Sequence, residues 1–217
     1  VFLRGGNGSS GHGIWLQGRA KIRDCSITNF AENGINIVAD SGSRTNSNNW
    51  IVDTASSNGN GGHGIYVQGG DTNAGCAQQI DVSGNGGWGI LDESFLGNTY
   101  IACHAANNVS GSYKASGANS RCLFLGCYSE GGQPDSEIAY PSTVVGGIWS
   151  GLKGTGNFAV DGGFDVVRSK NGNGNPNISV GTGAGIDSNF TSSVLALTAP
   201  EHSYWPYILP WAKGRWK

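Results

Sequence analysis

The amino-acid sequence predicts an all-β fold, a parallel β-helix in which short strands wind into a solenoid. One phrase returns four times, as GHGIWLQG at 11–18, ENGINIVA at 32–39, GHGIYVQG at 62–69 and GWGILDES at 87–94. The phrase alternates apolar and polar residues and is bounded by glycines, which is typical of strands. The i, i+3, i+4, i+7 spacing of an amphipathic helix is missing, so we expect almost no helix.

A second apolar segment lies between successive copies of the phrase, so each repeat is predicted to hold at least two short strands. These segments are 25–27, 50–52, 80–82, 100–102 and 123–125. The aligned isoleucines of the phrase, at 14, 35, 65 and 90, are 21, 30 and 25 residues apart, which is a solenoid period with insertions. A coil this small cannot bury its apolar side alone. Its strands are therefore expected to pair in parallel with those of the next coil, about 4.8 Å away.

Period-two alternation assigns each residue of the phrase to one side of its strand. The residues expected to point inward and stack in columns are Ile14, Leu16, Ile35, Ile37, Ile65, Val67 and Ile90. The residues expected to face outward form a first row of Trp15, Asn36, Tyr66 and Leu91 and a second row of Gln17, Val38, Gln68 and Glu93. A third row, just before the strand, holds His12, Asn33, His63 and Trp88.

The repeat begins with a strand at 1–3 and runs to about residue 132. Two polar insertions, at 40–49 and 69–77, leave the coil after the outward-facing strand, so they are expected to lie side by side as one wall of a groove. Between residues 130 and 150, two prolines and a longer apolar run weaken the pattern, which indicates a terminal coil. We therefore place the parallel β-helix at 1–151.

Residues 152–217 are predicted to form a β-rich C-terminal cap and an extended aromatic tail. Apolar runs at 158–160, 164–167, 178–180 and 193–197 are separated by Asn and Gly turns, as expected of strands that close a solenoid. The last segment, 204–217, holds five aromatic residues and two prolines. It is too apolar to stay exposed, so we expect it to pack on the helix or on a neighbouring subunit.

Composition narrows the class of ligand. A net charge of −2 with only 13% charged residues leaves no basic stripe for phosphates, so nucleic acid is not an expected partner. A surface rich in Asn, Ser, Gly and aromatic residues suits neutral polar ligands, and sugars are the obvious class. No run approaches the roughly 18 apolar residues of a membrane-spanning helix.

The cysteines and the start of the chain add three expectations. The five cysteines are interpreted as small buried residues rather than a disulfide framework, with Cys76 in a loop. No CxxC spacing occurs, so neither a metal nor a cofactor is expected. The chain has no methionine and opens on a strand-like segment, so we expect it to be a fragment of a longer chain.

The repeated G-I-x-V strand and the Y-S-E-G-G phrase at 128–132 resemble the pectin-lyase-like right-handed parallel β-helix superfamily, and within it the bacteriophage tailspike and depolymerase group. The resemblance covers about residues 1–151. It implies a right-handed solenoid, a polysaccharide partner, assembly as a homotrimer and a place outside the cell or on the virion surface, in a phage tail. The calcium cluster of aspartates with a partner arginine found in lyases of the superfamily has no counterpart on the outward rows, which argues against pectate-lyase chemistry.

Candidate catalytic residues follow from the requirements of glycoside hydrolysis. This reaction needs two carboxyl groups, about 5 Å apart for retention or about 6.5–9.5 Å apart for inversion, and neighbouring coils supply such spacings. The best pair is Glu93 as general acid with Asp71 or Asp92 as base. The alternative is that Asp92 caps a turn and Glu93 is a solvated surface group. Glu130 of the Y-S-E-G-G phrase is either catalytic, as the resemblance suggests, or a buried carboxylate that satisfies turn amides.

Candidate substrate-binding residues lie on the outward rows: Trp15, Gln17, Asn36, Tyr66, Gln68 and His63. The aromatic rings are expected to stack on sugars while the amides bind hydroxyl groups, or else the rings form an interface between subunits. His63 and His12 lie two coils apart, roughly 10 Å, so they are not expected to share a metal and a turn-stabilising role is favoured.

The leading functional hypothesis is a glycan-recognising tailspike-like protein, with or without endo-acting glycoside hydrolase activity on a polysaccharide. The rival hypothesis is a structural spike, filament subunit or adhesin without catalysis. A third class is a polysaccharide lyase or epimerase, because the superfamily includes these activities.

Overall fold

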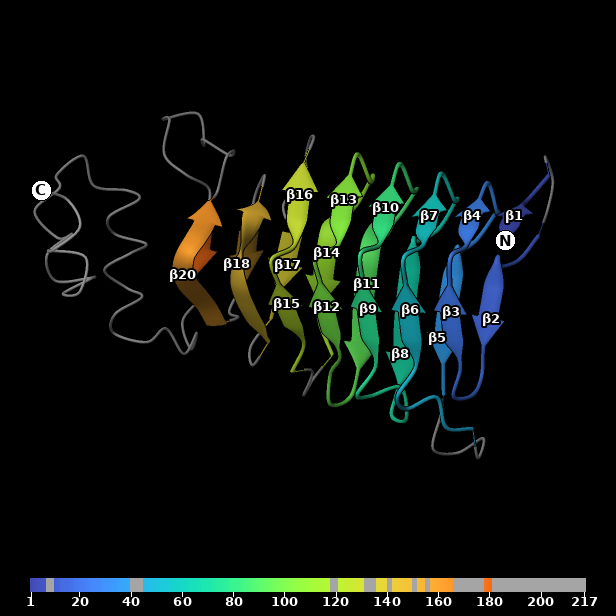
Figure 1. Ribbon diagram of the computed structural model, residues 1–217, viewed down its shortest axis with the longest axis horizontal. Coiled ribbons are helices and arrows are strands. Elements are labelled where there is room, and N and C mark those ends of the chain that lie inside the picture. The colour runs from blue at the N-terminus through green and yellow to red at the C-terminus, as the bar shows by residue number, and fades with distance from the viewer. Residues whose placement is uncertain are drawn as a thin grey trace, which may run out of the picture.

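The structure is a computed structural model that describes residues 1–6, 10–39, 45–117, 121–130, 136–139, 142–149, 152–154, 157–165 and 178–180. Every regular element in this part of the chain is a strand, and no helix occurs in it. The strands stack in parallel along one axis as a β-solenoid (Figure 1). The predicted all-β solenoid is therefore confirmed.

Successive coils contribute strands to three parallel ladders. The first ladder holds β2 (Ile14–Leu16), β5 (Ile35–Val38), β8 (Ile65–Gly69), β11 (Trp88–Ser94), β14 (Gly111–Ala115), β17 (Ser136–Ile138), β19 (Leu152–Gly154) and β21 (Ile178–Val180). The second ladder holds β3 (Lys21–Arg23), β6 (Ile51–Asp53), β9 (Cys76–Gln78), β12 (Thr99–Ile101) and β15 (Leu123–Leu125). The third ladder holds β1 (Phe2–Arg4), β4 (Ser26–Thr28), β7 (Ser56–Asn58), β10 (Asp81–Ser83), β13 (His104–Ala106) and β16 (Tyr128–Glu130).

Five complete coils of three strands therefore begin at β2, β5, β8, β11 and β14. In the next coil a single strand, β18 (Thr143–Trp149), pairs with both β15 and β16 and so joins the second and third ladders. Gly146 and Gly147 lie in the middle of β18 at φ +61° and +88°, a backbone region that glycine adopts without strain. These two glycines let β18 bend around the corner at which, in the earlier coils, a turn joins separate strands of the second and third ladders.

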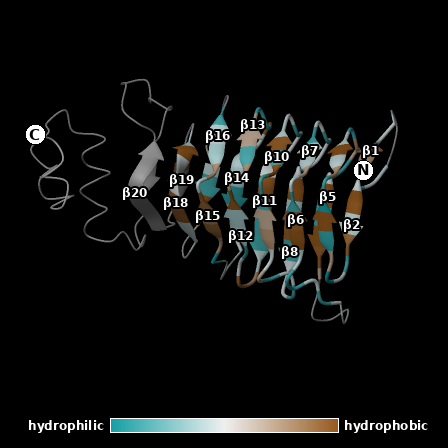
Figure 2. Cartoon of the chain, in the orientation of Figure 1, coloured by the Kyte–Doolittle hydropathy of each residue, from teal (hydrophilic) through white to brown (hydrophobic). Residues whose placement is uncertain are grey.

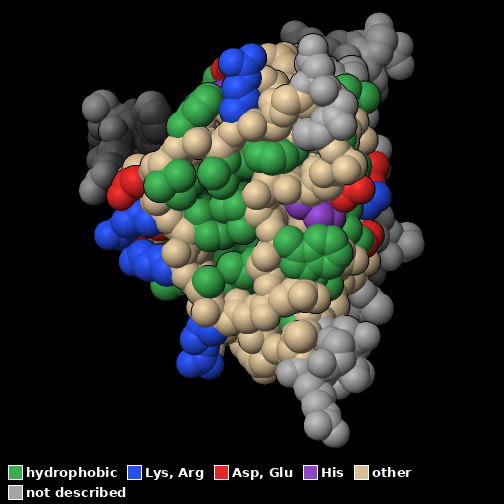
Figure 3. Space-filling model, turned by 90° about the vertical axis from the view of Figure 1, so that its right-hand side faces the viewer, with side chains coloured by type: hydrophobic (Ala, Val, Ile, Leu, Met, Phe, Trp, Pro, Cys, Tyr) green, Lys and Arg blue, Asp and Glu red, His purple; other side chains and the backbone are tan. Residues whose placement is uncertain are grey.

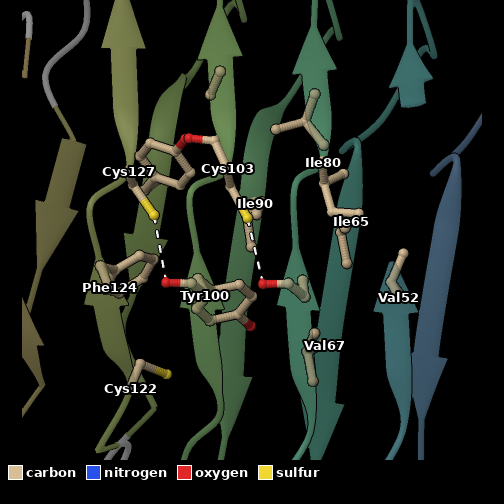
Figure 4. Close-up of a cluster of buried hydrophobic side chains, with 14 of the residues drawn as sticks. Val52, Ile65, Val67, Ile80, Ile90, Tyr100, Cys103, Cys122, Phe124 and Cys127 are labelled. Carbon is tan, nitrogen blue, oxygen red and sulfur yellow. Dashed lines mark hydrogen bonds between the residues drawn. The ribbon is translucent and has the colours of Figure 1, made fainter. Parts of the chain in front are cut away.

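The register confirms the predicted inward columns. Ile14, Ile35, Ile65 and Ile90 pair in sequence, and the column continues into Tyr113 of β14. Apolar residues recur along the strands of successive coils (Figure 2). Toward the later coils the core becomes aromatic, and Tyr100 stacks on Phe124 with ring centroids 4.9 Å apart. Buried thiols fill the spaces between these rings and bond to backbone carbonyls, as Cys127 does to the carbonyl of Tyr100 (Figure 4).

The glycine that precedes each isoleucine of the repeated phrase is required by close packing. A Cβ at Gly89 would lie 2.6 Å from the carbonyl oxygen of Ser112 and 2.8 Å from Nδ2 of Asn108. A Cβ at Gly64 would lie 2.6 Å from the carbonyl oxygen of Gly89. Any side chain at these positions would push adjacent coils apart, which explains why the phrase keeps its G-I pair.

Buried asparagines at equivalent corners tie the coils together. The backbone N–H of Asn60 donates to Oδ1 of Asn85 over 3.0 Å, and the N–H of Asn85 donates to Oδ1 of Asn108 over 3.0 Å. The amide of Asn85 also donates to the carbonyl of Ser57 and to Oδ1 of Asn108. This asparagine ladder gives the buried turn amides partners that the sheet hydrogen bonds cannot supply.

The segments predicted as the second strand of each repeat belong to two different ladders. Segments 25–27 and 80–82 correspond to β4 and β10 of the third ladder, whereas 50–52, 100–102 and 123–125 correspond to β6, β12 and β15 of the second. Strands such as β7 and β9 escaped prediction because their inward residues, Ser57 and Ala77, are small and carry no hydrophobic signal. Cys76, expected in a loop, begins β9.

The two polar insertions lie side by side where they are described. The N–H of Ser47 donates to the carbonyl of Asp71 over 2.8 Å, and the N–H of Asn73 donates to Oδ1 of Asn48 over 2.7 Å. Residues 40–44 of the first insertion lie outside the described residues. That these insertions form the wall of a groove stays a prediction.

The parallel ladders continue past the predicted boundary at residue 151. β19 pairs with β17, β20 (Asn157–Asp165) pairs with β18, and β21 pairs with β19, all in parallel. The predicted strand at 193–197 and the aromatic tail at 204–217 lie outside the described residues. The C-terminal cap and the tail therefore stay predictions.

Apolar side chains reach the surface at the end of the solenoid where β1 and β2 lie (Figure 3). Ile14 is partly exposed there, whereas Ile35, one coil further along the same column, is fully buried. Leu3 and Cys25 pack against the core but are likewise only partly buried. All five cysteines are free thiols. No helix in the described ranges is long and apolar enough to cross a membrane.

Candidate functional site

The outward side of β2, β5, β8, β11 and β14, here called the ladder face, collects most of the predicted binding residues. The register places the first row in the order Trp15, Asn36, Tyr66, Leu91 and Lys114. It places Val38, Gln68 and Glu93 in the second row. Gln17 is exposed and directly follows β2. The predicted alignment of the first row is therefore confirmed, but two of its members, Asn36 and Leu91, are buried rather than exposed.

The third row acts as a hydrogen-bonded chain across four coils. The N–H of Asn33 donates to Nδ1 of His12 over 3.1 Å, the N–H of His63 donates to Oδ1 of Asn33 over 2.8 Å, and the N–H of Trp88 donates to Nδ1 of His63 over 2.8 Å. Each histidine accepts at Nδ1, so this nitrogen carries no proton. The turn-stabilising role expected for His12 and His63 is confirmed.

Each of these histidines also holds an aromatic ring of the first row. The rings of His12 and Trp15 have centroids 5.0 Å apart, and those of His63 and Tyr66 are 5.3 Å apart. Nε2 of His12 lies 3.0 Å from Oε2 of Glu32, which fixes that ring from its other side. The G-H-G-I-[WY] phrase thus builds the same unit twice, an aromatic ring supported by a histidine that the next coil anchors.

Asn36 separates the two supported rings. Trp15 is 59% exposed, whereas Asn36 in the adjacent coil is 1% exposed. Its Oδ1 accepts hydrogen bonds from Nδ2 of Asn33 over 3.2 Å and from Nε2 of Gln68 over 3.4 Å. Along the row an exposed ring, a buried amide and the partly exposed ring of Tyr66 therefore follow one another.

Glu93 lies beside the second ring. The hydroxyl of Tyr66 donates to Oε2 of Glu93 over 2.6 Å, and Oγ of Ser116 donates to Oε1 over 3.4 Å. Burial, and then the hydrogen bond to Glu93, raise the pKa of the Tyr66 hydroxyl, so it remains a donor at neutral pH. Burial lowers the pKa of His63, against the opposing effect of the Glu93 charge. A neutral imidazole suits the hydrogen bond it accepts from Trp88.

Toward the later coils the ladder face ends in a charge pair. Nζ of Lys114 lies 2.9 Å from Oε2 of Glu137 and 5.2 Å from the centroid of the Trp88 ring. Leu91, in the same row, is buried. This end of the face offers less exposed aromatic surface than the end at Trp15 and Tyr66.

The structure places two of the four predicted catalytic residues, Asp92 and Glu130, away from the surface of the ladder face. Asp92 is fully buried, because its side chain points into the core in the column of Val67. There it accepts hydrogen bonds from the backbone N–H of Ser94, Nδ2 of Asn98, the hydroxyl of Tyr100 and Sγ of Cys122. A glycan on the ladder face cannot reach it, so we remove Asp92 from the proposed acid–base pair. Asp71 is half-buried in the turn after β8, one coil before Glu93.

Glu130 lies on the third ladder rather than on the ladder face. Its carboxylate is exposed, accepts from the hydroxyl of Tyr128 and has Oε1 3.8 Å from Nε2 of His104. Nδ1 of His104 lies 3.0 Å from Oδ1 of Asp81, and the His104 ring stacks on Tyr128 with centroids 5.1 Å apart. The expectation of a buried carboxylate serving turn amides is therefore wrong.

This cluster of Asp81, His104, Tyr128 and Glu130 was missed at the level of sequence. Its members come from three coils, and only the register of β10, β13 and β16 brings them together. The residue pattern holds a signal in retrospect, since a polar residue opens each of these strands. In the described part of the chain, no group of three or more His, Cys, Asp and Glu side chains is arranged to hold a metal ion.

No protein-family model, curated protein or solved structure matches this chain.

Proposed function

We propose that the protein recognises a glycan, which lies along the ladder face and stacks on Trp15 and Tyr66. The observation that carries this proposal is the repeated unit of an outward ring supported by an anchored histidine, present in two coils of the same row. A residue that served only packing would gain nothing from being held outward in this way. Rigid aromatic surface lowers the entropy that is lost on binding.

The chemistry of the ladder face matches that of a sugar chain. A pyranose ring presents an apolar side that stacks on an aromatic ring, while its hydroxyl groups need donors and acceptors. The face supplies the rings of Trp15 and Tyr66, with the amides of Gln17 and Gln68 in the neighbouring row. Asn36, between the rings, is buried, and its Oδ1 already accepts from Asn33 and Gln68.

The spacing of the coils also suits an extended polymer. Trp15 and Tyr66 are two coils apart, about 10 Å at the spacing of parallel strands. One coil is comparable in length to one pyranose residue of an extended chain. Two rings two coils apart would therefore contact alternate sugar residues, and we expect affinity to rise until an oligosaccharide spans both.

Binding to a glycan array, followed by titration calorimetry on the hits, tests the proposal. We expect Trp15→Ala and Tyr66→Ala each to weaken binding by about tenfold or more, since buried aromatic contacts dominate such sites. Tyr128→Ala is the matched control, because Tyr128 is an exposed tyrosine of the third ladder. Equal affinity in all three variants would place the glycan elsewhere, and absence of any binding would leave a structural spike or filament subunit.

Hydrolysis of the bound glycan is a second candidate function, favoured by one observation. Glu93 stands beside the Tyr66 ring and its carboxylate is positioned by two hydroxyl groups. Asp71, in the preceding coil, is the partner carboxylate that a glycosidase would need. An assay for new reducing ends separates the cases. Release of reducing ends by the parent protein that is lost in both Glu93→Gln and Asp71→Asn supports a hydrolase. Binding without any release of reducing ends supports an adhesin. An unsaturated product or an epimerised sugar would instead indicate a lyase or an epimerase.

The resemblance noted from the repeated strand further suggests a homotrimer that lies outside the cell or on a virion surface. Light scattering of the purified chain tests the assembly, and a monomeric mass would contradict it.

A further inference from the structure

We propose that the glycan carries free amino groups, as a glucosamine polymer does, and that Glu93 receives one of its ammonium groups. This inference rests on the proposed function, because it names the class of glycan that the same face binds.

The charges of the ladder face point to this class. The strands from β2 to β17 carry three charged residues that reach the surface of this face, namely Glu93, Lys114 and Glu137. Lys114 and Glu137 form a salt bridge of 2.9 Å, so their charges offset each other. Among the described residues, Glu93 has no salt-bridge partner. On these strands Glu93 is therefore the carboxylate left unneutralised, and it lies next to the aromatic surface of the face, while Asp71 lies beyond β8 in the following turn.

The partners of Glu93 leave its charge available. The two hydroxyl groups that donate to it, those of Tyr66 and Ser116, are neutral, and they fix the carboxylate without cancelling its charge. Each carboxylate oxygen has two lone pairs, so each can accept one bond more than the hydroxyl occupies. An ammonium group is the donor that gains most there, because hydrogen bonds between ionised groups are the stronger kind.

The Tyr66 ring favours the same ligand. Tyr66 and Glu93 lie in adjacent coils and are joined by their 2.6 Å hydrogen bond, so a sugar stacked on the ring has its substituents within reach of the carboxylate. A cation over an aromatic ring is further attracted by the ring itself. A uronic acid would bring its carboxylate toward Glu93 and Asp71, and like charges at such distances repel. An N-acetyl group would remove the charge that Glu93 recognises.

Three oligosaccharides test the inference by titration calorimetry at about pH 6 and low ionic strength, where surface charges are little screened. They are a glucosamine hexamer, the N-acetylglucosamine hexamer with the same backbone and a galacturonic acid hexamer. We expect the glucosamine hexamer to bind about tenfold more tightly than its acetylated form, as a charge-assisted hydrogen bond predicts. The advantage should shrink as salt is added, and the galacturonic acid hexamer should bind most weakly.

Two variants assign the preference to one carboxylate. Glu93→Gln should abolish the preference, so that the glucosamine hexamer and the acetylated hexamer bind with equal affinity. Asp24→Asn makes the same change of charge in an exposed turn before β4, at a φ of +52° that asparagine adopts readily, and should keep the full preference. Both variants should unfold at the same urea concentration as the parent chain.

Equal affinity for the two hexamers, or a preference that survives in Glu93→Gln, would overturn the inference and leave the proposed function standing. If no glycan of any class binds, the proposed function and the inference fail together.

Discussion

Replacing Asp92 by asparagine should destabilise the protein, although the two side chains have nearly the same shape. The carboxylate lies fully inside the solenoid and accepts four hydrogen bonds, of which those from Asn98, Tyr100 and Cys122 end on Oδ2 at 2.8, 2.6 and 3.0 Å. In asparagine an NH₂ group replaces one oxygen, so donors would face donors. The amide loses least when its oxygen keeps the three donors on the Oδ2 side, and its NH₂ group then faces the backbone N–H of Ser94, which loses its acceptor.

The expected loss is about 2 kcal/mol, since a buried donor left without a partner costs roughly 1–3 kcal/mol. With an m-value of about 2 kcal/mol/M, this lowers the urea midpoint by about 1 M. Tryptophan fluorescence reports the transition, because Trp50 and Trp149 are buried.

Glu93→Gln is the matched control, because it makes the same change one residue along the strand but on the outward side. We expect its free energy of unfolding to stay within about 0.5 kcal/mol of the parent value, as for most surface substitutions. If Asp92→Asn kept the parental midpoint and lost glycan binding instead, Asp92 would face the ligand and the assignment of sides in β11 would be refuted.

Three further predictions concern the forces that hold the coils together. His63→Asn should make the free energy of unfolding less sensitive to acid. Because the pKa of His63 is lowered in the folded protein, its contribution to stability is full above about pH 6.5 and is lost as the pH falls below it, whereas an asparagine can accept the same hydrogen bond, as Asn33 does, without titrating. A parental pH profile in urea titrations would contradict this. Asn85→Ala should lower the free energy of unfolding by about 3 kcal/mol, because it leaves the backbone N–H of Asn60 without its acceptor and removes the two hydrogen bonds that the Asn85 side chain donates. A loss below about 1 kcal/mol would show that the asparagine ladder is not required for stability. Hydrogen bonds from Gln78 and Arg23 lower the pKa of Asp53 to about 2, so the contribution of Asp53 to stability is complete above about pH 4 and is lost toward pH 2. Asp53→Asn should therefore reduce the loss of stability between about pH 4 and pH 2. An unchanged loss in this range would argue against the hydrogen bonds of Asp53 with Gln78 and Arg23.

The first ladder could be predicted because its inward residues are large and β-branched. Ile35, Ile65 and Ile90 repeat with one glycine before them, so the strand, its register and its outward rows follow from period two and the solenoid interval. The same alternation places Asp92 inward, two residues after Ile90. A carboxylate in a core is unusual. The donors that stabilise it include the side chain of Asn98, six residues later, and the thiol of Cys122 in the next coil, so the pattern of the strand itself does not reveal them.

The rest of the site depends on contacts between coils that no local pattern encodes. The support of Trp15 by His12 requires the N–H of Asn33 from the following coil to fix the imidazole. The cluster around His104 needs the register of strands whose inward residues are as small as Ala105 and so give no hydrophobic signal. Hydrogen-bonded registers of this kind become visible only once the coils are stacked.

The most direct test of glycan recognition on the ladder face is a crystal structure of the chain soaked with an oligosaccharide taken from the binding assay. We predict sugar rings stacked on Trp15 and Tyr66, with the chain crossing Asn36 between them and a polar substituent within hydrogen-bond distance of Glu93. Sugar density on the third ladder beside His104 and Tyr128, with the ladder face empty, would contradict the proposal.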